Sequence, residues 1–261
     1  MTGGPGRAPS RAAGVATEGA TAGVPPLAGM ELAIFDKDGT LIDFHLMWSD
    51  WVRELGDRMA AANDERRLDA ILHEVMGIDP ASGRVLPHGG LAATPMVRLR
   101  AAVVRAVEAA GYANATAERL VAAGWHAPDP VLLARPVTDL PALFASLRAA
   151  GIRIAVATSD DRRPTERTLA HLDIADLVEA LSCADDGHPV KPNPDAVHWI
   201  CRTLGVAESR TAVIGDSPAD LAMGRAAGAG LVVGVLTGVG DRATLASRAD
   251  RVLESVADLV R

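Results

Sequence analysis

Short apolar runs alternate with helical patterns along much of this chain. Apolar or nearly apolar segments occur at residues 32–35, 152–157, 211–214 and 231–236, with weaker ones at 177–181 and 251–253. Segments of this kind are typical of strands buried on both faces of a parallel sheet. Apolar residues at helical spacing separate them, in helices expected at about 140–150, 164–171 and 195–204, one ending near Gly228 and one ending at Arg261. The alternation predicts an α/β fold with a doubly wound, Rossmann-like parallel sheet.

The stretch from residue 45 to residue 135 carries helical periodicity only. Helices are expected at about 45–62, 64–75, 94–110 and 116–124, and the glycines and prolines of residues 77–90 indicate a loop. We therefore predict an all-helical insert at 45–135 within a core domain made of residues 30–44 and 136–261. Residues 1–29 are rich in Gly, Ala, Pro and Thr and are expected to form a disordered tail. Met30, directly before the first strand, is a candidate start of translation.

Composition excludes several classes of partner. The formal net charge is -7, so the chain lacks the basic surface that nucleic-acid binding requires. No window approaches the ~18 uninterrupted apolar residues of a membrane span, and polar residues interrupt any signal-peptide core in the tail. Cys183 and Cys201 lack redox or metal-ligand spacing and suit burial in a reducing, cytoplasmic setting. The oligomeric state, monomer or homodimer, stays open.

Polar side chains follow the predicted strands where each strand ends. Asp36 and Asp38 follow the first strand, Thr158 the second, and Asp216 and Asp220 a later one, while a proline-rich loop brings Lys191. The carboxyl ends of parallel strands share one edge of the sheet. Carboxylates crowded there need a counter-charge, and a hard divalent cation such as Mg²⁺ suits an all-oxygen set of ligands.

Lysine is rare enough in this chain to be informative. Of the 26 basic residues, only Lys37 and Lys191 are lysines. A lysine in such a background indicates a place that needs a compact ammonium on a flexible stem, and Lys191 lies in one. Lys37 lies between the two aspartates, where we expect its side chain to face away and to have no role.

The segments DKDGTL (Asp36–Leu41), Thr158, KPNPD (Lys191–Asp195) and GDSPAD (Gly215–Asp220) resemble the four motifs of the haloacid dehalogenase (HAD) superfamily. The resemblance covers the chain from about Met30 onward, and the helical insert is similar to the family's C1 cap. Among members, the chain is most similar to phosphoglycolate phosphatase-like hydrolases. The resemblance implies a three-layer Rossmann-like core with a helical cap domain.

The resemblance also implies a role for each matched residue. Asp36 would attack phosphorus to form an aspartyl phosphate, and Asp38 would be the general acid and then the general base. Mg²⁺ would be held by Asp36, the main-chain carbonyl of Asp38 and Asp216, with Asp220 behind them. Thr158 and Lys191 would bind the phosphoryl oxygens. The implied partner is a small phosphorylated metabolite, a phosphoglycolate-like compound or a sugar phosphate monoester.

Single residues argue for or against the other activities found in this family. The presence of Asp38 argues against carbon–halogen cleavage, which needs no acid for an alkoxide. The insert contains no lysine, so a Schiff base of the phosphonate-cleaving kind is excluded. A phosphomutase of the beta-phosphoglucomutase type shares both aspartates and stays open, as does a non-catalytic HAD-fold binding protein.

A few further residues invite a functional interpretation. His45, Trp48 and Trp51 lie on one helical face and are expected to pack rather than to bind substrate. In the loop 77–90, Arg84 is the best candidate for binding a substrate carboxylate, and His88 could contact the leaving group. The run 160–163 is expected to be a solvated helix start with an aspartate cap, and the glycine-rich run 234–240 a turn after a strand.

Overall fold

The computed structural model describes residues 1, 26–62, 68–86, 89–93, 96–126, 128–129 and 131–260. Six parallel strands form one sheet in the order β3-β2-β1-β4-β5-β6. The strands are β1 (Leu32–Phe35), β2 (Arg153–Ala157), β3 (Ala180–Ser182), β4 (Thr211–Gly215), β5 (Leu231–Val235) and β6 (Arg251–Leu253). From β1 the chain first builds the sheet on one side, with β2 and β3, and then on the other, with β4 to β6. The strand order therefore reverses between β1 and β4, and open α/β sheets bind ligands at such a point.

Helices cover both faces of this sheet because the strands are apolar on both faces. On one face, Leu32 and Ile34 of β1 pack in a cluster with α8 (Asp195–Leu204) and α9 (Pro218–Ala227). On the other face, Phe35 packs against Phe144 of α6 (Leu140–Ala149), with ring centroids 5.3 Å apart, and α7 (Arg162–His171) joins the same cluster. The predicted three-layer, Rossmann-like α/β core is confirmed.

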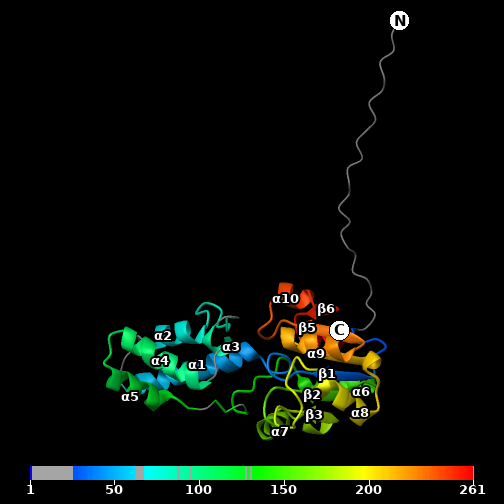
Figure 1. The fold of residues 1–261 in the computed structure, drawn as a ribbon, viewed down its shortest axis with the longest axis horizontal. Coiled ribbons are helices and arrows are strands. Elements are labelled where there is room, and N and C mark those ends of the chain that lie inside the picture. The colour runs from blue at the N-terminus through cyan, green and yellow to red at the C-terminus, as the bar shows by residue number, and fades with distance from the viewer. Residues whose placement is uncertain are drawn as a thin grey trace.

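The helical insert forms a second lobe beside the core (Figure 1). It contains α1 (Phe44–Ala61), α2 (Leu68–Met76), α3 (Gly90–Ala93), α4 (Met96–Ala109) and α5 (Asn114–Gly124). Trp51 of α1 is completely buried at its centre and makes an edge-to-face contact with Trp125, with centroids 5.4 Å apart. Within the residues that the structure describes, none of the helices combines the length and the apolarity needed to cross a membrane.

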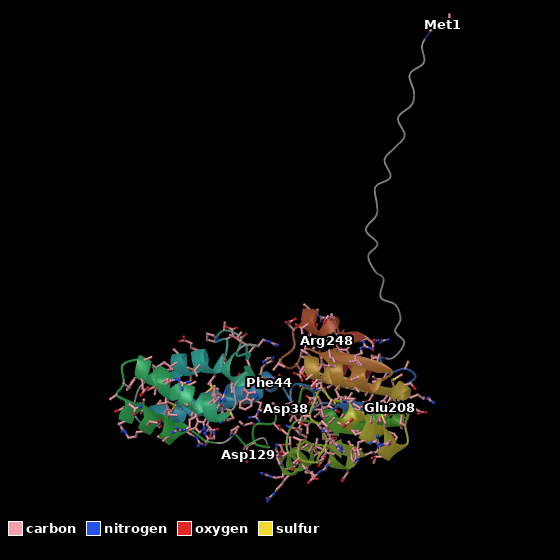
Figure 2. The ribbon with its side chains drawn as sticks, in the orientation of Figure 1. Met1, Asp38, Phe44, Asp129, Glu208 and Arg248 are labelled. Carbon is pink, nitrogen blue, oxygen red and sulfur yellow. The ribbon has the colours of Figure 1, made fainter. Side chains whose placement is uncertain are left out.

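Two chain segments connect the lobes, and they lie next to each other. Asp43 donates a backbone hydrogen bond to Arg135 at 2.7 Å, and Val137 donates one to Leu41 at 3.0 Å. Figure 2 shows Asp38 and Phe44 where the lobes meet, while Glu208 lies far from that junction in the core. We propose that the core and the helical domain divide at these two paired segments, near residues 45 and 135, as the sequence predicts.

Four details of the sequence-based assignment need correction. The edge strand β3 begins at Ala180 rather than 177, after a 3₁₀ helix at Ala175–Leu177. The last helix is a 3₁₀ helix, Val256–Val260, in which the buried Val256 and Leu259 are three residues apart, a spacing that suits three residues per turn. A short helix, α10 (Arg242–Ala246), was not predicted. The sequence feature that indicates it is Asp241, the N-cap residue, whose side chain accepts a hydrogen bond from Thr244 N. Helix α6 ends at Ala149 and Ala150 is its C-cap residue, whereas the sequence suggests Gly151 for the cap.

Candidate active site

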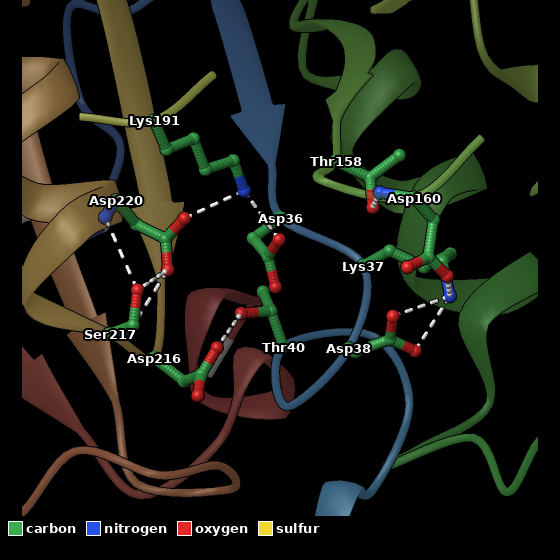
Figure 3. A network of polar contacts seen from close by, with 10 residues as sticks. All are labelled: Asp36, Lys37, Asp38, Thr40, Thr158, Asp160, Lys191, Asp216, Ser217 and Asp220. Atoms are coloured by element: carbon green, nitrogen blue, oxygen red, sulfur yellow. Dashed lines mark hydrogen bonds and ion pairs between the residues drawn. The ribbon is translucent and has the colours of Figure 1, made fainter. Parts of the chain in front are cut away.

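The six predicted site residues line one pocket at the carboxyl edge of the sheet. Asp36, Thr158 and Asp216 directly follow β1, β2 and β4. Lys191 comes from the loop before α8 and Asp220 from the first turn of α9. Together with Asp38 they line a cavity of about 220 Å³. The strand-end argument therefore predicted this convergence, which Figure 3 shows from close by.

Lys191 joins two of the carboxylates inside this pocket. Its Nζ lies 2.5 Å from Oδ1 of Asp36 and 2.7 Å from Oδ1 of Asp220, and its side chain is 8% exposed. Asp36, Asp216 and Asp220 each offer a carboxylate oxygen, and these oxygens lie within 4.8 Å of one another. Three carboxylates are thus close to one ammonium, so their combined negative charge is only partly neutralised in a buried pocket.

The crowding changes the acidity of these groups. Burial raises the pKa of Asp36 to about 7, although the Lys191 ammonium opposes this, and the Asp220 charge adds to it. Burial also raises the pKa of Asp216 well above its ordinary value, and Asp36 and Asp220 raise it further. Carboxylates that resist ionisation in this way have too little positive charge around them, even with Lys191 close by. The donor set, all oxygen and short of positive charge, fits a hard divalent cation.

Asp216 is held by the glycine-rich turn that follows β5, within residues 234–240. Val239 N donates to Oδ2 of Asp216 at 2.8 Å, and Gly240 N donates to its main-chain oxygen at 3.0 Å. Thr237 Oγ1 donates to the carbonyl of Gly39 at 2.6 Å, which ties the turn to the first motif. The turn after β5 is confirmed, and it also forms a wall of the candidate active site.

Gly238 in this turn has no room for a side chain. A Cβ at this position would lie 1.9 Å from Oδ2 of Asp216. We expect Gly238→Ala to displace that carboxylate and to weaken Mg²⁺ affinity by about 10-fold or more, as losses around metal ligands commonly do. The midpoint of Mg²⁺-dependent thermal stabilisation would measure this. Gly111→Ala is the control: its Cβ would meet nothing within 4 Å, and its positive φ, which Gly238 lacks, adds backbone strain without touching a carboxylate of the site. It should keep the wild-type Mg²⁺ affinity, and equal losses in both variants would contradict the explanation.

Asp220 is fixed by the start of α9. Ser217 caps this helix, and Oδ2 of Asp220 accepts from Ser217 N at 3.0 Å and from its hydroxyl at 2.6 Å. This reciprocal capping box uses one carboxylate oxygen and leaves the other for Lys191. Asp220 is therefore a rigidly held partner of Lys191.

Thr158 lies across the pocket with its hydroxyl oriented by the backbone. Its Oγ1 accepts a hydrogen bond from Asp160 N at 3.1 Å, and the residue is buried. Because this bond uses a lone pair, the hydroxyl hydrogen is free to point into the pocket. Thr158 can therefore donate to an anionic oxygen bound there.

The expectation for Lys37 was wrong. Its side chain is 1% exposed, and its Nζ lies 2.6 Å from both carboxylate oxygens of Asp38 and 3.0 Å from Asp160. In Figure 3 the Asp38 carboxylate lies with Lys37 and Asp160, apart from Asp36 and Asp216. Burial raises the pKa of Asp38, and Lys37 opposes that effect. Only the main chain of Asp38 is thus placed to reach the carboxylate cluster.

The helix start that follows β2 is also less solvated than expected. Asp160 pairs with Lys37, and Arg162 binds Asp186 at 2.7 Å and donates to the carbonyl of Leu181 at 2.8 Å. Asp161 is the N-cap residue of α7, as predicted, but its side chain accepts no capping hydrogen bond. Sequence spacing located this segment correctly, while the long-range partners of its charges were not visible in it.

The family is decided by comparison with known sequences. The family described as haloacid dehalogenase-like hydrolase matches residues 30–228, well over half of the chain. The chain belongs to this family. All six site residues lie within the matched region.

Individual relatives of this HAD-like hydrolase match over shorter stretches. The phosphoglycolate phosphatase of Rhodospirillum rubrum is 34% identical over 108 residues, 41% of this chain and 45% of that protein. The N-acetylmuramic acid 6-phosphate phosphatase of Pseudomonas aeruginosa is 34% identical over 97 residues, 37% of this chain and 43% of that protein. The chain thus spans less than half the length of these two curated relatives.

Solved structures share the fold. The crystal structure of a HAD family hydrolase from Deinococcus radiodurans, with bound phosphate and sodium, has a TM-score of 0.58 and 23% identity to this chain. The comparison covers 89% of this chain and 94% of that one. At this level of identity the likeness shows the architecture, a parallel-sheet core with a helical cap.

In this HAD-like hydrolase, the other singled-out residues divide between packing and the entrance to the site. His45 is buried, and its Nδ1 accepts from Val85 N at 3.1 Å, so it fixes a cap loop as a structural residue. Trp51 is packed as expected, whereas Trp48 lines a second cavity next to the site. Arg84 is exposed on the loop. His88 lies outside the described residues.

Proposed function

We propose that this chain is a Mg²⁺-dependent phosphatase that hydrolyses phosphate monoesters of small metabolites. The observation that supports this is Lys191 bonded to Asp36 at 2.5 Å in a pocket where Asp36, Asp216 and Asp220 approach within 4.8 Å. That arrangement supports the proposed roles: Asp36 as nucleophile, Lys191 as the phosphate-binding ammonium, and the carboxylates as cation ligands. The relatives named as phosphatases support the same reaction class.

The reaction divides into two steps on the side chains of this pocket. In the first, a carboxylate oxygen of Asp36 forms a bond to phosphorus while the ester oxygen leaves, and Asp38 gives that oxygen its proton. In the second, Asp38 takes a proton from water, which attacks phosphorus and releases Asp36 and inorganic phosphate. Thr158 and Lys191 bind the phosphoryl oxygens and stabilise the charge that they carry in both steps.

The proposed cation site consists of groups already on one side of the pocket. Asp36, Asp216 and the main-chain carbonyl of Asp38 would hold Mg²⁺, and Asp220 would support them through Lys191. When bound, Mg²⁺ would neutralise the carboxylates and polarise the transferring phosphoryl group. The close approach of Gly39 and Gly238 to the Asp216 carboxylate keeps that ligand in a fixed position.

Metal removal tests this proposal directly. With EDTA we expect hydrolysis of p-nitrophenyl phosphate to fall by about 100-fold or more, because several kcal/mol of charge stabilisation is lost, and excess Mg²⁺ to restore it. Mg²⁺ at ~100 times its Kd stabilises the fold by about 2.7 kcal/mol, a rise in Tm of roughly 5–10 °C for a domain of this size. Activity and Tm that are both indifferent to EDTA would contradict the proposal.

Identifying the products separates a phosphatase from the other two functions that the sequence leaves open. A phosphomutase would isomerise a sugar phosphate without releasing inorganic phosphate, which ³¹P NMR detects. A binding protein without turnover would show stabilisation by phosphate and no product. Release of inorganic phosphate in proportion to the alcohol formed is the result expected for a phosphatase.

A further inference from the structure

A larger cavity adjoins the pocket that holds Asp36. It has a volume of about 470 Å³, against about 220 Å³ for the phosphate pocket, and the two share Asp38, Phe44 and Asp160 in their walls. Cavities of roughly 300–1,000 Å³ hold ligands that contain rings. The neighbouring space is therefore large enough for much more than a two-carbon group.

Asp38 stands on the border between the two cavities. Under the proposed function, on which this inference rests, Asp38 gives its proton to the ester oxygen, so that oxygen lies at the same border. The phosphoryl group lies in the smaller pocket, next to Lys191 and Thr158. The rest of the substrate, the leaving group, must then extend into the larger cavity.

The walls of this larger cavity are mostly apolar. Trp48 and Phe44, both from the start of α1, contact each other edge-to-face with ring centroids 6.1 Å apart. Four other apolar residues line it. Pro128 and Leu133 come from the segment that returns from the cap to the core, Pro164 from the start of α7 and Met47 from α1. Flat aromatic and proline surfaces of this kind pack against the faces of a ring.

The charged groups of the cavity are unfavourable for an anion. Among the described lining residues the one cation is Lys37, which is already bonded to Asp38 at 2.6 Å and to Asp160 at 3.0 Å. Asp161 is exposed, accepts no capping bond and makes no ion pair within the described part of the chain. No arginine belongs to the described lining, which excludes Arg84 from it. A carboxylate entering here would meet Asp161 without a free cation, whereas an ammonium would find a partner.

We propose that the substrate of this chain is a phosphate monoester whose leaving group carries a ring and a protonated amine, such as an amino sugar or an aminocyclitol, and lacks a carboxylate. Trp48 and Phe44 would contact the ring, and Asp161 would bind the amine. This assigns the large cavity to an amine-bearing leaving group and disfavours phosphoglycolate.

Two pairs of esters that are matched in size isolate the charge. Phosphoethanolamine and phosphoglycolate both have two-carbon leaving groups but opposite charges, and glucosamine 6-phosphate differs from glucose 6-phosphate by one amine. We expect kcat/KM to favour the amine of each pair. The difference should reach about 10-fold between the first two esters, because attraction of the amine and repulsion of the carboxylate by the exposed Asp161 add, and each is worth about a few-fold. Glucosamine 6-phosphate should be the best of the four because it also has a ring.

Two variants and a control assign the preference to named residues. Asp161→Asn should bring the glucosamine-to-glucose ratio of kcat/KM close to one, and Trp48→Ala should raise KM for glucosamine 6-phosphate more than for phosphoethanolamine. Asp176→Asn makes the same change of net charge at an exposed position of the core, in the 3₁₀ helix before β3, and should leave the ratio unchanged. Circular dichroism verifies that each variant is folded.

The outcomes separate this inference from the function on which it rests. If p-nitrophenyl phosphate is hydrolysed but phosphoglycolate matches or exceeds phosphoethanolamine, the phosphatase stands and the amine proposal is overturned. An unchanged glucosamine-to-glucose ratio in Asp161→Asn would overturn it as well. If no ester releases phosphate in the presence of Mg²⁺, both proposals fall together.

Discussion

Asp36→Asn is expected to lower kcat for phosphate-ester hydrolysis by about 10⁴-fold or more, the scale of loss when a nucleophile is removed. An amide oxygen is too weak a nucleophile to attack phosphorus. The variant also loses one of the three carboxylates that approach within 4.8 Å, so it should bind Mg²⁺ more weakly. Stopped assays of phosphate release, at saturating substrate and Mg²⁺, measure the loss.

The fold of this variant should persist, which makes the activity loss interpretable. The pKa of Asp36 is raised to about 7, so its ionised form opposes folding increasingly as the pH rises through that value, and a neutral amide removes the opposition. Asp176→Asn, at an exposed position before β3 that does not line the pocket, should keep wild-type kcat. Acid-quenched wild-type enzyme should yield a phosphorylated peptide that contains Asp36. Comparable rates for wild type and Asp36→Asn would refute the covalent mechanism.

The parts of the site that sequence could predict are those fixed by local rules. An apolar run that stops at a polar residue defines a strand end, and parallel strands put their ends together. Asp36, Thr158 and Asp216 follow from that rule alone. Asp220 and Lys191 needed the motif as well, because they reach the pocket from a helix start and a loop.

The parts that sequence could not predict depend on side-chain direction and on distant backbone. Lys37 follows a strand and could point to either side; only the position of Asp160, 123 residues later in the chain, decides its direction. Val239 holds Asp216 through a main-chain amide, and a main-chain donor leaves no trace in residue type. Trp48 and Trp51 lie on the same face of α1, so their spacing cannot tell them apart. Trp48 lines a cavity because the segment returning from the cap, with Pro128 and Leu133, forms its opposite wall.

Lys191 links the chemistry of the pocket to the stability of the fold. Asp36 and Asp220 raise its pKa, although burial opposes them. A lysine with a raised pKa contributes stability that is complete below its ordinary pKa and is lost only as the pH rises past the raised value. The ammonium of Lys191 therefore stays charged throughout the neutral range. Removing the ammonium leaves Asp36 and Asp220 buried with no other close cation among the described residues.

Lys191→Met is expected to lower kcat/KM by about 10³-fold, because a preorganised charge on the phosphoryl oxygens is lost. It should also destabilise the metal-free protein at pH 8 by about 3–5 kcal/mol, the cost of stranding buried charge. The loss should shrink as the pH is lowered to 5, where Asp36 and Asp216 hold protons more readily, and it should shrink on addition of Mg²⁺. Denaturant unfolding at both pH values, with EDTA or with Mg²⁺, measures each effect.

Lys37→Met supplies the matched control, since Lys37 is the only other lysine in the sequence and also pairs with two carboxylates. Its partners Asp38 and Asp160 are more exposed, with side chains 25% and 44% accessible, so water can solvate them when the ammonium is removed. Both variants lose one buried ammonium, but only Lys191 neutralises carboxylates that Mg²⁺ could neutralise in its place. Mg²⁺ should therefore restore more stability to Lys191→Met than to Lys37→Met. Equal recovery in the two variants would mean that the cation does not bind beside Lys191.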